Sequence, residues 1–126
     1  MRYRTALSVV RGTGAAKDGP RHWWAQRLTA VALIPLGIGF VAVMIALVGG
    51  EYDAARAALA HPVAAALWIL FTVALFHHAQ LGLQVVVEDY VHTRGLKIAG
   101  IVAVKFAALA LGATCVVSIL RVSVGS

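Results

Sequence analysis

Apolar residues divide the chain into three long hydrophobic stretches separated by short polar segments. Residues 28–48 contain no charged side chain, residues 62–87 contain no Lys, Arg, Asp or Glu, and residues 98–120 contain only Lys105. A helix of about 20 apolar residues crosses a bilayer core of ~30 Å. None of the stretches alternates between apolar and polar residues as a transmembrane β-strand does. The pattern therefore predicts an all-α membrane protein with three transmembrane helices.

The segments between these stretches are short and more polar. Residues 1–27 form a basic tail, residues 51–60 have the pattern of a short amphipathic helix at the membrane surface, and residues 91–95 predict a tight turn. The chain is too short for two domains. We therefore interpret residues 1–126 as a single membrane-anchor domain.

Composition narrows the class of protein. Hydrophobic residues make up 61% of the chain and charged residues 13%, whereas a soluble domain carries about 25% charged residues. A water-soluble globule of this size could not bury so much apolar surface. Disordered chains contain few apolar residues, so disorder is excluded as well. The single cysteine, Cys115, excludes an intrachain disulfide framework and a metal site built from several cysteines.

The net charge of +6 is distributed unevenly. Apart from Lys105, eight basic residues lie in the tail and in the segment 88–97, whereas Arg56 and Arg121 lie on the other side of the predicted membrane. Cytoplasmic segments carry the excess of Lys and Arg, so we expect the N-terminus in the cytoplasm. Because topology accounts for the basic residues, we expect no nucleic-acid partner.

The second hydrophobic stretch contains polar residues at membrane depth, where they are costly and usually have a role. At helical spacing they form two stripes about 100° apart. One stripe contains His77, Gln80, Gln84 and Glu88, and the other contains His78, Gly82 and Asp89. A polar path for a transported solute would explain the first stripe, and interhelical hydrogen bonds explain it equally well.

His78 has the most distinctive surroundings of these residues. Ala74 precedes it by four positions and Gly82 follows it by four, so small side chains flank the imidazole on one helix face. This clearance suits a haem macrocycle whose iron is bound by a ring nitrogen. A histidine hydrogen-bonded between closely packed helices is the alternative interpretation, and His77 is an alternative ligand.

Residues near the predicted cytoplasmic surface allow a functional and an ordinary interpretation. Arg27 could pair with an acidic group such as a haem propionate, or act only as a positive-inside charge. Tyr90 could donate a hydrogen bond to a carbonyl while Asp89 orients a neighbour or passes a proton, or both could be interfacial residues. For Lys105, extension of the side chain toward the cytoplasmic headgroups is favoured over a cofactor contact.

Two segments carry a resemblance to a known family. His-Ala-x-x-Gly occurs at residues 78–82 and is followed by Asp89-Tyr90, with eleven positions from the histidine to the aspartate. The first hydrophobic stretch opens with Gln-Arg-Leu-Thr-Ala at residues 26–30. In this order, and with three helices over the whole chain, these segments resemble the smaller hydrophobic membrane-anchor subunit of succinate dehydrogenase, respiratory complex II.

The resemblance implies a role for each matched residue. His78 would be an axial ligand of haem b, with the second histidine supplied by a partner cytochrome b anchor subunit, and Arg27 would lie near a haem propionate. Tyr90 would hydrogen-bond the carbonyl of ubiquinone, supported by Asp89. The resemblance also implies an iron–sulfur subunit and a flavoprotein subunit as partners, and the bacterial cytoplasmic (inner) membrane as the location.

Three alternatives to this function remain open. The chain could be the anchor of a related quinol:fumarate reductase, because the sequence does not distinguish the direction of the reaction. It could be a structural membrane subunit without cofactor contact. A small transporter or channel subunit that uses the stripe beginning at His77 is the third alternative. The sequence predicts no catalytic residue for dicarboxylate chemistry, which would take place on the flavoprotein.

Overall fold

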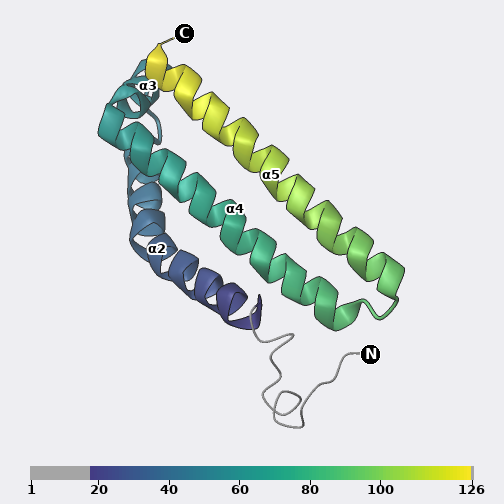
Figure 1. Ribbon diagram of the computed structural model, residues 1–126. Coiled ribbons are helices and arrows are strands. Elements are labelled where there is room, and N and C mark those ends of the chain that lie inside the picture. Colours follow the sequence, from purple (N-terminus) through teal and green to yellow (C-terminus); the bar gives the residue numbers. More distant parts are fainter. Residues whose placement is uncertain (1–17, 126) are drawn as a thin grey trace, which may run out of the picture.

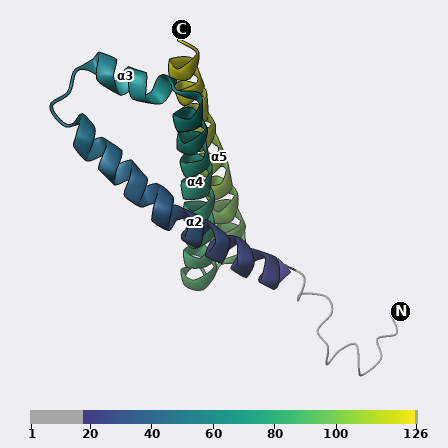
Figure 2. The same cartoon turned by 90° about the vertical axis from the view of Figure 1, so that its left-hand side faces the viewer.

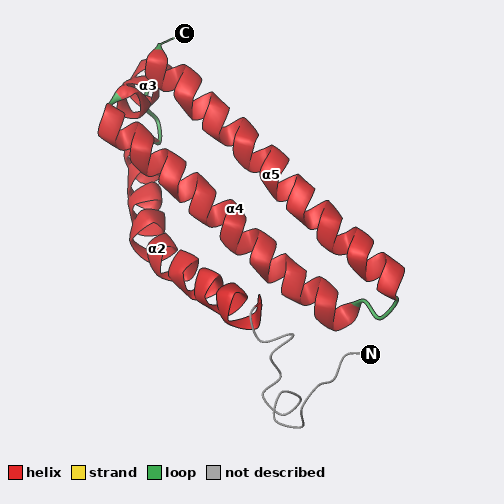
Figure 3. Cartoon of the chain, in the orientation of Figure 1, coloured by secondary structure: helices red, strands yellow, loops and turns green. Residues whose placement is uncertain are grey.

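The computed structural model describes residues 18–125, which form four helices (Figure 1). In chain order these are α2 (Asp18–Leu47), α3 (Tyr52–Ala60), α4 (Pro62–Tyr90) and α5 (Arg94–Val124). Short loops join them, and this part of the chain contains no strand (Figure 3). The predicted all-α fold with three long helices is thus confirmed, and the short helix expected over residues 51–60 is α3.

The long helices extend beyond the predicted hydrophobic stretches. Helix α2 begins at Asp18 and continues through Pro35, so it includes part of the segment predicted as a tail. The α4–α5 connection comprises only residues 91–93. The hydrophobic stretches indicate only the part of each helix that lies within the membrane. The helices continue past them, because Arg, Trp and Lys at the membrane surface are compatible with helical backbone. Residues 1–17 of the predicted tail lie outside the part that the structure describes.

The ends of the helices follow local chemistry. Gly49 (φ 77°) turns the chain after α2, and Gly125 (φ 82°) ends α5, both in the left-handed region that glycine tolerates. Pro62 occupies the first turn of α4, where its missing N–H is not needed. The Nδ1 atom of His61 accepts a hydrogen bond of 3.3 Å from the Val63 N–H.

Helix α4 lies at the centre of the arrangement and packs against both α2 and α5. Helices α4 and α5 run antiparallel side by side, whereas α2 crosses α4 and diverges from it toward the end where α3 lies (Figure 2). A Cβ atom on Gly100 would lie 3.0 Å from Cγ1 of Val87, and one on Gly112 would lie 3.6 Å from the Phe76 ring. Gly100 therefore permits a close approach of α5 to α4, whereas the contact at Gly112 would be of ordinary length with a side chain present.

Few side chains are buried within the described chain. They are Ala65, Thr72, Ala74 and Leu81, all on α4. Large apolar side chains on the other helices remain exposed, for example Ile38 (67%) on α2 and Leu109 (68%) on α5. Helices α2, from Pro20, α4 and α5 are each long and apolar enough to cross a membrane. The chain is thus a multi-pass membrane protein whose apolar faces are directed to lipid or to other helices.

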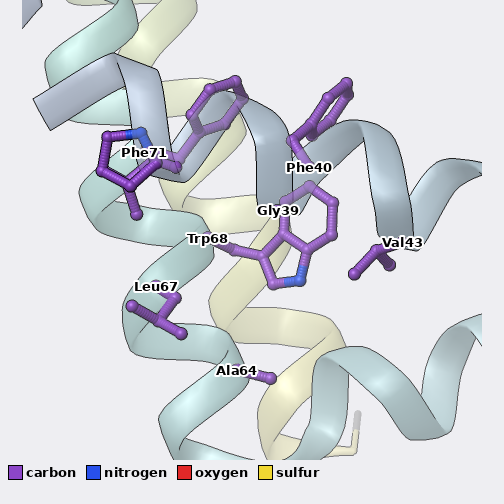
Figure 4. A pocket seen from close by; sticks show the side chains of 9 residues that line it. Gly39, Phe40, Val43, Ala64, Leu67, Trp68 and Phe71 are labelled. Atoms are coloured by element: carbon purple, nitrogen blue, oxygen red, sulfur yellow. The ribbon is translucent and has the colours of Figure 1, made fainter.

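An apolar pocket of about 360 Å³ occupies the space where α2 diverges from α4. Phe40 of α2 stacks on Phe71 with ring centroids 4.9 Å apart and meets Trp68 edge-on at 5.3 Å (Figure 4). These aromatic contacts hold α2 and α4 together on the half of the bundle that lies toward α3. His78 lies on the other half of α4.

Candidate functional site

The polar residues of the second hydrophobic stretch line a groove of about 1,090 Å³ between α2 and the second half of α4. Helix α2 contributes His22, Trp23, Gln26 and Arg27, and helix α5 contributes Lys105. Helix α4 contributes His77, His78, Gln80, Leu81, Gln84, Val85 and Glu88. The groove therefore brings together both candidate histidines and Arg27 from two helices that are distant in sequence.

His78 is half-buried at the contact between α2 and α4. Its Nδ1 atom lies 3.1 Å from Oγ1 of Thr29 on α2. This contact fixes one edge of the imidazole ring, and it leaves Nε2 without a partner among the described residues. His77, in contrast, is exposed and makes no hydrogen bond within the described chain. The two adjacent histidines thus differ: only His78 is held in orientation.

The small residues on either side of His78 serve helix packing. A Cβ atom on Gly82 would lie 3.8 Å from Nε2 of Gln26, so a side chain of α2 lies at an ordinary packing distance from this glycine. Ala74 is buried within the bundle. Gly82 therefore lies beside α2, and its role in the approach of a macrocycle stays a prediction.

Two polar atoms in the groove are enclosed without a hydrogen-bond partner. They are Nε2 of His22 and Oε1 of Gln26. Leaving such atoms unsatisfied costs about 1–3 kcal/mol each, and most buried polar atoms in native proteins are paired. The groove thus contains hydrogen-bonding capacity that no described residue of this chain satisfies.

Arg27 lies on α2 at the edge of the groove and is exposed. Its guanidinium carbon is 5.4 Å from the centroid of the Trp23 ring, a cation–π distance. The rings of Trp23 and Trp24 meet edge to face, with centroids 5.0 Å apart. Trp23 therefore restricts Arg27 while leaving its N–H donors available to an acidic group.

The stripe that begins at His77 is connected by hydrogen bonds within α4. Nε2 of Gln80 donates to Oε1 of Gln84 over 3.0 Å, and Nε2 of Gln84 donates to Oε1 of Glu88 over 2.9 Å. Within the described chain these bonds therefore join residues four apart on one helix and not residues of two helices. Neither His77 nor Lys105 joins this chain of bonds, although both line the groove.

Asp89 and Tyr90 end α4 and are exposed. They lie about 16–18 Å along the helix axis from His78, at 1.5 Å per residue. Neither side chain makes a hydrogen bond or ion pair within the described chain, and neither lines the groove. The structure thus brings Arg27 and His78 into one groove and keeps Asp89 and Tyr90 at a separate surface position.

Sequence reasoning assigned no role to three residues near the site: His22 and Gln26, which line the groove, and Thr29, which contacts His78. The only available signal was their proximity to Arg27, since Gln26 and Thr29 lie in the 26–30 segment that carried the resemblance. Their contacts with α4 depend on the register between two helices, which the pattern of a single helix does not contain.

Comparison with known proteins agrees with this architecture. The family model described as "Succinate dehydrogenase/Fumarate reductase transmembrane subunit" matches residues 1–112. The chain belongs to this family. The resemblance inferred from the sequence is therefore confirmed. No solved structure matches the chain significantly.

Individual members of the family cover most of the chain. The succinate dehydrogenase hydrophobic membrane anchor subunit of Paracoccus denitrificans is 30% identical over 126 residues, 100% of this chain and 97% of that protein. The subunit of the same name from Rickettsia bellii is 30% identical over 103 residues, 82% of each chain. The succinate dehydrogenase membrane anchor subunit of Reclinomonas americana is 28% identical over 96 residues, 74% of this chain and 80% of that protein.

Membership of this family agrees with the observed helices. Its members are transmembrane subunits, and three helices of this chain are suited to cross a membrane. The bacterial relatives fit a multi-pass protein of the inner membrane.

Proposed function

We propose that the chain is the membrane anchor of a succinate:quinone oxidoreductase, in which His78 provides one axial ligand of haem b. Arg27 binds a haem propionate, and Tyr90, supported by Asp89, contributes to a ubiquinone site at the end of α4. Succinate is oxidised on another subunit, and this chain contributes to the passage of electrons from there to quinone.

The observation that carries the proposal is the convergence of chemistry in the groove between α2 and α4. His78 lines it with one ring nitrogen held by Thr29 and the other available. The enclosed Nε2 of His22 and Oε1 of Gln26 lack partners, and Arg27 is available to an anion. A histidine nitrogen for the iron and a guanidinium for a carboxylate fit a haem with its propionate side chains.

When bound, haem b supplies an iron centre that accepts and releases single electrons. The residues of this chain bind and orient it: His78 holds the iron, and Arg27 neutralises a propionate. Trp23 restricts Arg27, which lowers the entropy cost of that ion pair.

A second iron ligand comes from a partner cytochrome b anchor subunit. His77 and His78 are adjacent on one helix and cannot bind opposite faces of one macrocycle. The exposed apolar faces of α2 and α5 support association with other transmembrane helices. The iron–sulfur and flavoprotein subunits complete the complex on the membrane side where α2 begins.

Tyr90 is available to quinone because its hydroxyl has no partner in the described chain. A tyrosine at the membrane surface can donate a hydrogen bond to a quinone carbonyl. Asp89 is the adjacent carboxylate and can supply or orient a proton there. Since both residues are exposed, other subunits must form the remainder of this pocket.

The test is the haem content of the purified complex with His78→Leu and, as matched control, His77→Leu. We expect the b-type band of the reduced-minus-oxidised spectrum to be lost with His78→Leu and retained with His77→Leu. Retention of the band in both variants would overturn the ligand assignment. Absence of any band in the wild-type complex would support a structural subunit without cofactor contact.

A further inference from the structure

We infer that Thr29 is the positioning residue for His78: its hydroxyl accepts a hydrogen bond from Nδ1, which leaves Nε2 as the unprotonated nitrogen. This inference rests on the proposed haem ligation and adds a residue from α2 to it. Thr29 lies 49 positions before His78 in the sequence.

The Thr29 hydroxyl makes three close contacts. Its Oγ1 atom lies 2.7 Å from the carbonyl oxygen of Ala25, 3.1 Å from that of Gln26 and 3.1 Å from Nδ1 of His78. A hydroxyl has one hydrogen to donate, and a carbonyl oxygen can only accept. The 2.7 Å contact is typical of an O–H···O hydrogen bond. The Thr29 hydrogen is therefore directed at the Ala25 carbonyl.

The direction of this bond decides the tautomer of His78. With its hydrogen committed to Ala25, Oγ1 can meet Nδ1 only as an acceptor, so Nδ1 carries the proton. In a neutral imidazole the other nitrogen then holds a lone pair. The reverse assignment would place Oγ1 2.7 Å from the Ala25 oxygen with no hydrogen between them.

Metal binding needs this tautomer. A histidine ligand donates its other N–H to an acceptor, which fixes the ring and increases ligand basicity. Loss of such a partner typically costs ~10–100-fold in metal affinity or activity. Close to this contact, Nε2 of Gln26 on α2 lies 3.8 Å from the position of a Cβ atom on Gly82, an ordinary packing distance, so α2 and α4 are in contact beside His78.

The experiment compares Thr29→Ala with Thr29→Ser in the assembled complex, since these two variants differ by one oxygen atom. Thr72→Val is the control, because Thr72 makes the same kind of bond to the carbonyl four residues earlier, 2.8 Å to Trp68, without touching a histidine. The readouts are the rate of haem loss to apomyoglobin and the electron paramagnetic resonance signal of the oxidised haem.

We expect Thr29→Ala to lose haem ~10-fold faster or more and to shift the resonance signal, whereas Thr29→Ser and Thr72→Val keep wild-type behaviour. Equal behaviour of the alanine and serine variants would overturn the inference. If His78→Leu abolishes the haem band while both Thr29 variants match wild type, only the role of Thr29 fails. If His78→Leu retains the band, the proposed ligation itself fails.

Discussion

Tyr90 closes α4 with a side chain that is 78% exposed and without a partner in the described chain. A hydrogen bond from its hydroxyl to quinone would contribute about 1 kcal/mol to the binding free energy. This corresponds to about a fivefold change in an equilibrium constant. We therefore expect Tyr90→Phe to lower kcat/KM for ubiquinone reduction by the complex about fivefold and to leave haem content unchanged.

Tyr52 provides the matched control for this substitution. It is 75% exposed and begins α3, at the opposite end of the bundle from Tyr90 (Figure 1). Tyr52→Phe is expected to keep wild-type kinetics in the same assay. Unchanged activity with Tyr90→Phe, or an equal loss with both variants, contradicts a role of Tyr90 in quinone binding.

At the scale of single residues, the sequence identified candidate side chains of the site but not their contacts. His78 and Arg27 were identified from spacing and from the resemblance, and both line the groove. The contact of His78 with Thr29 was not predictable, because it depends on how α2 and α4 are aligned. For the same reason the position of Gln26 beside Gly82 was not predictable.

At the scale of the elements, the glycines of α5 give a direct test of helix packing. A Cβ on Gly100 would lie 3.0 Å from Val87, tighter than ordinary contact, whereas one on Gly112 would lie 3.6 Å from Phe76. Both substitutions by Ala gain the same helix propensity, ~1 kcal/mol, but only the first crowds α4. We expect the Gly100→Ala protein to unfold at a lower temperature than the Gly112→Ala protein. The free energy of unfolding should differ by about 1 kcal/mol or more.

The measurement is the midpoint of thermal unfolding of the purified complex in detergent, with wild type beside the two variants. Gly112→Ala should match or exceed wild type, because its new methyl group meets Phe76 at an ordinary distance. A ranking in which Gly100→Ala is the more stable variant would mean that α5 does not approach α4 as closely as described.

The existence of the helices was predictable from the sequence, whereas their ends were not. Apolar length is sufficient to identify three spanning helices, and the composition of residues 51–60 was sufficient for α3. The start of α2 at Asp18 was missed because charged and aromatic residues at a membrane surface reduce hydropathy without ending a helix. The α4–α5 connection is shorter than predicted for the same reason, since Arg94 and Gly95 already belong to α5.

At the scale of the whole molecule, the unequal distribution of basic residues predicts the orientation in the membrane. The start of α2 and the α4–α5 loop lie at one end of the bundle, and α3 lies at the other (Figure 1). After replacement of Cys115 by Ser, we expect His92→Cys to be protected from a membrane-impermeant thiol reagent in intact spheroplasts. His61→Cys, at the α3–α4 junction, should react under the same conditions.

Inverted membrane vesicles supply the reciprocal control for this experiment. In these vesicles the cysteine introduced at position 92 should react and the cysteine at position 61 should be protected. The opposite pattern in both preparations would place the N-terminus outside the cytoplasm. The proposed attachment of the soluble subunits at the end where α2 begins would then be wrong.

The described chain buries few side chains, all on α4, and this explains why its assembly could not be derived from the sequence alone. Composition predicted an apolar surface, but which faces lie against lipid and which against partner helices depends on other subunits. Under the proposed haem ligation the groove needs a partner for the same reason, since a second histidine would have to come from another subunit.

Exchange of the ligand tests the central claim, that His78 binds the iron of haem b, most directly. Methionine can replace histidine as a haem ligand, and histidine–methionine ligation raises the reduction potential relative to two histidines. The measurement is a redox titration of the haem in the purified complex with His78→Met and with His77→Met. We predict that His78→Met retains haem with a raised midpoint potential and an altered spectrum, while His77→Met is unchanged. An unaltered potential and spectrum in the His78→Met complex would contradict the claim.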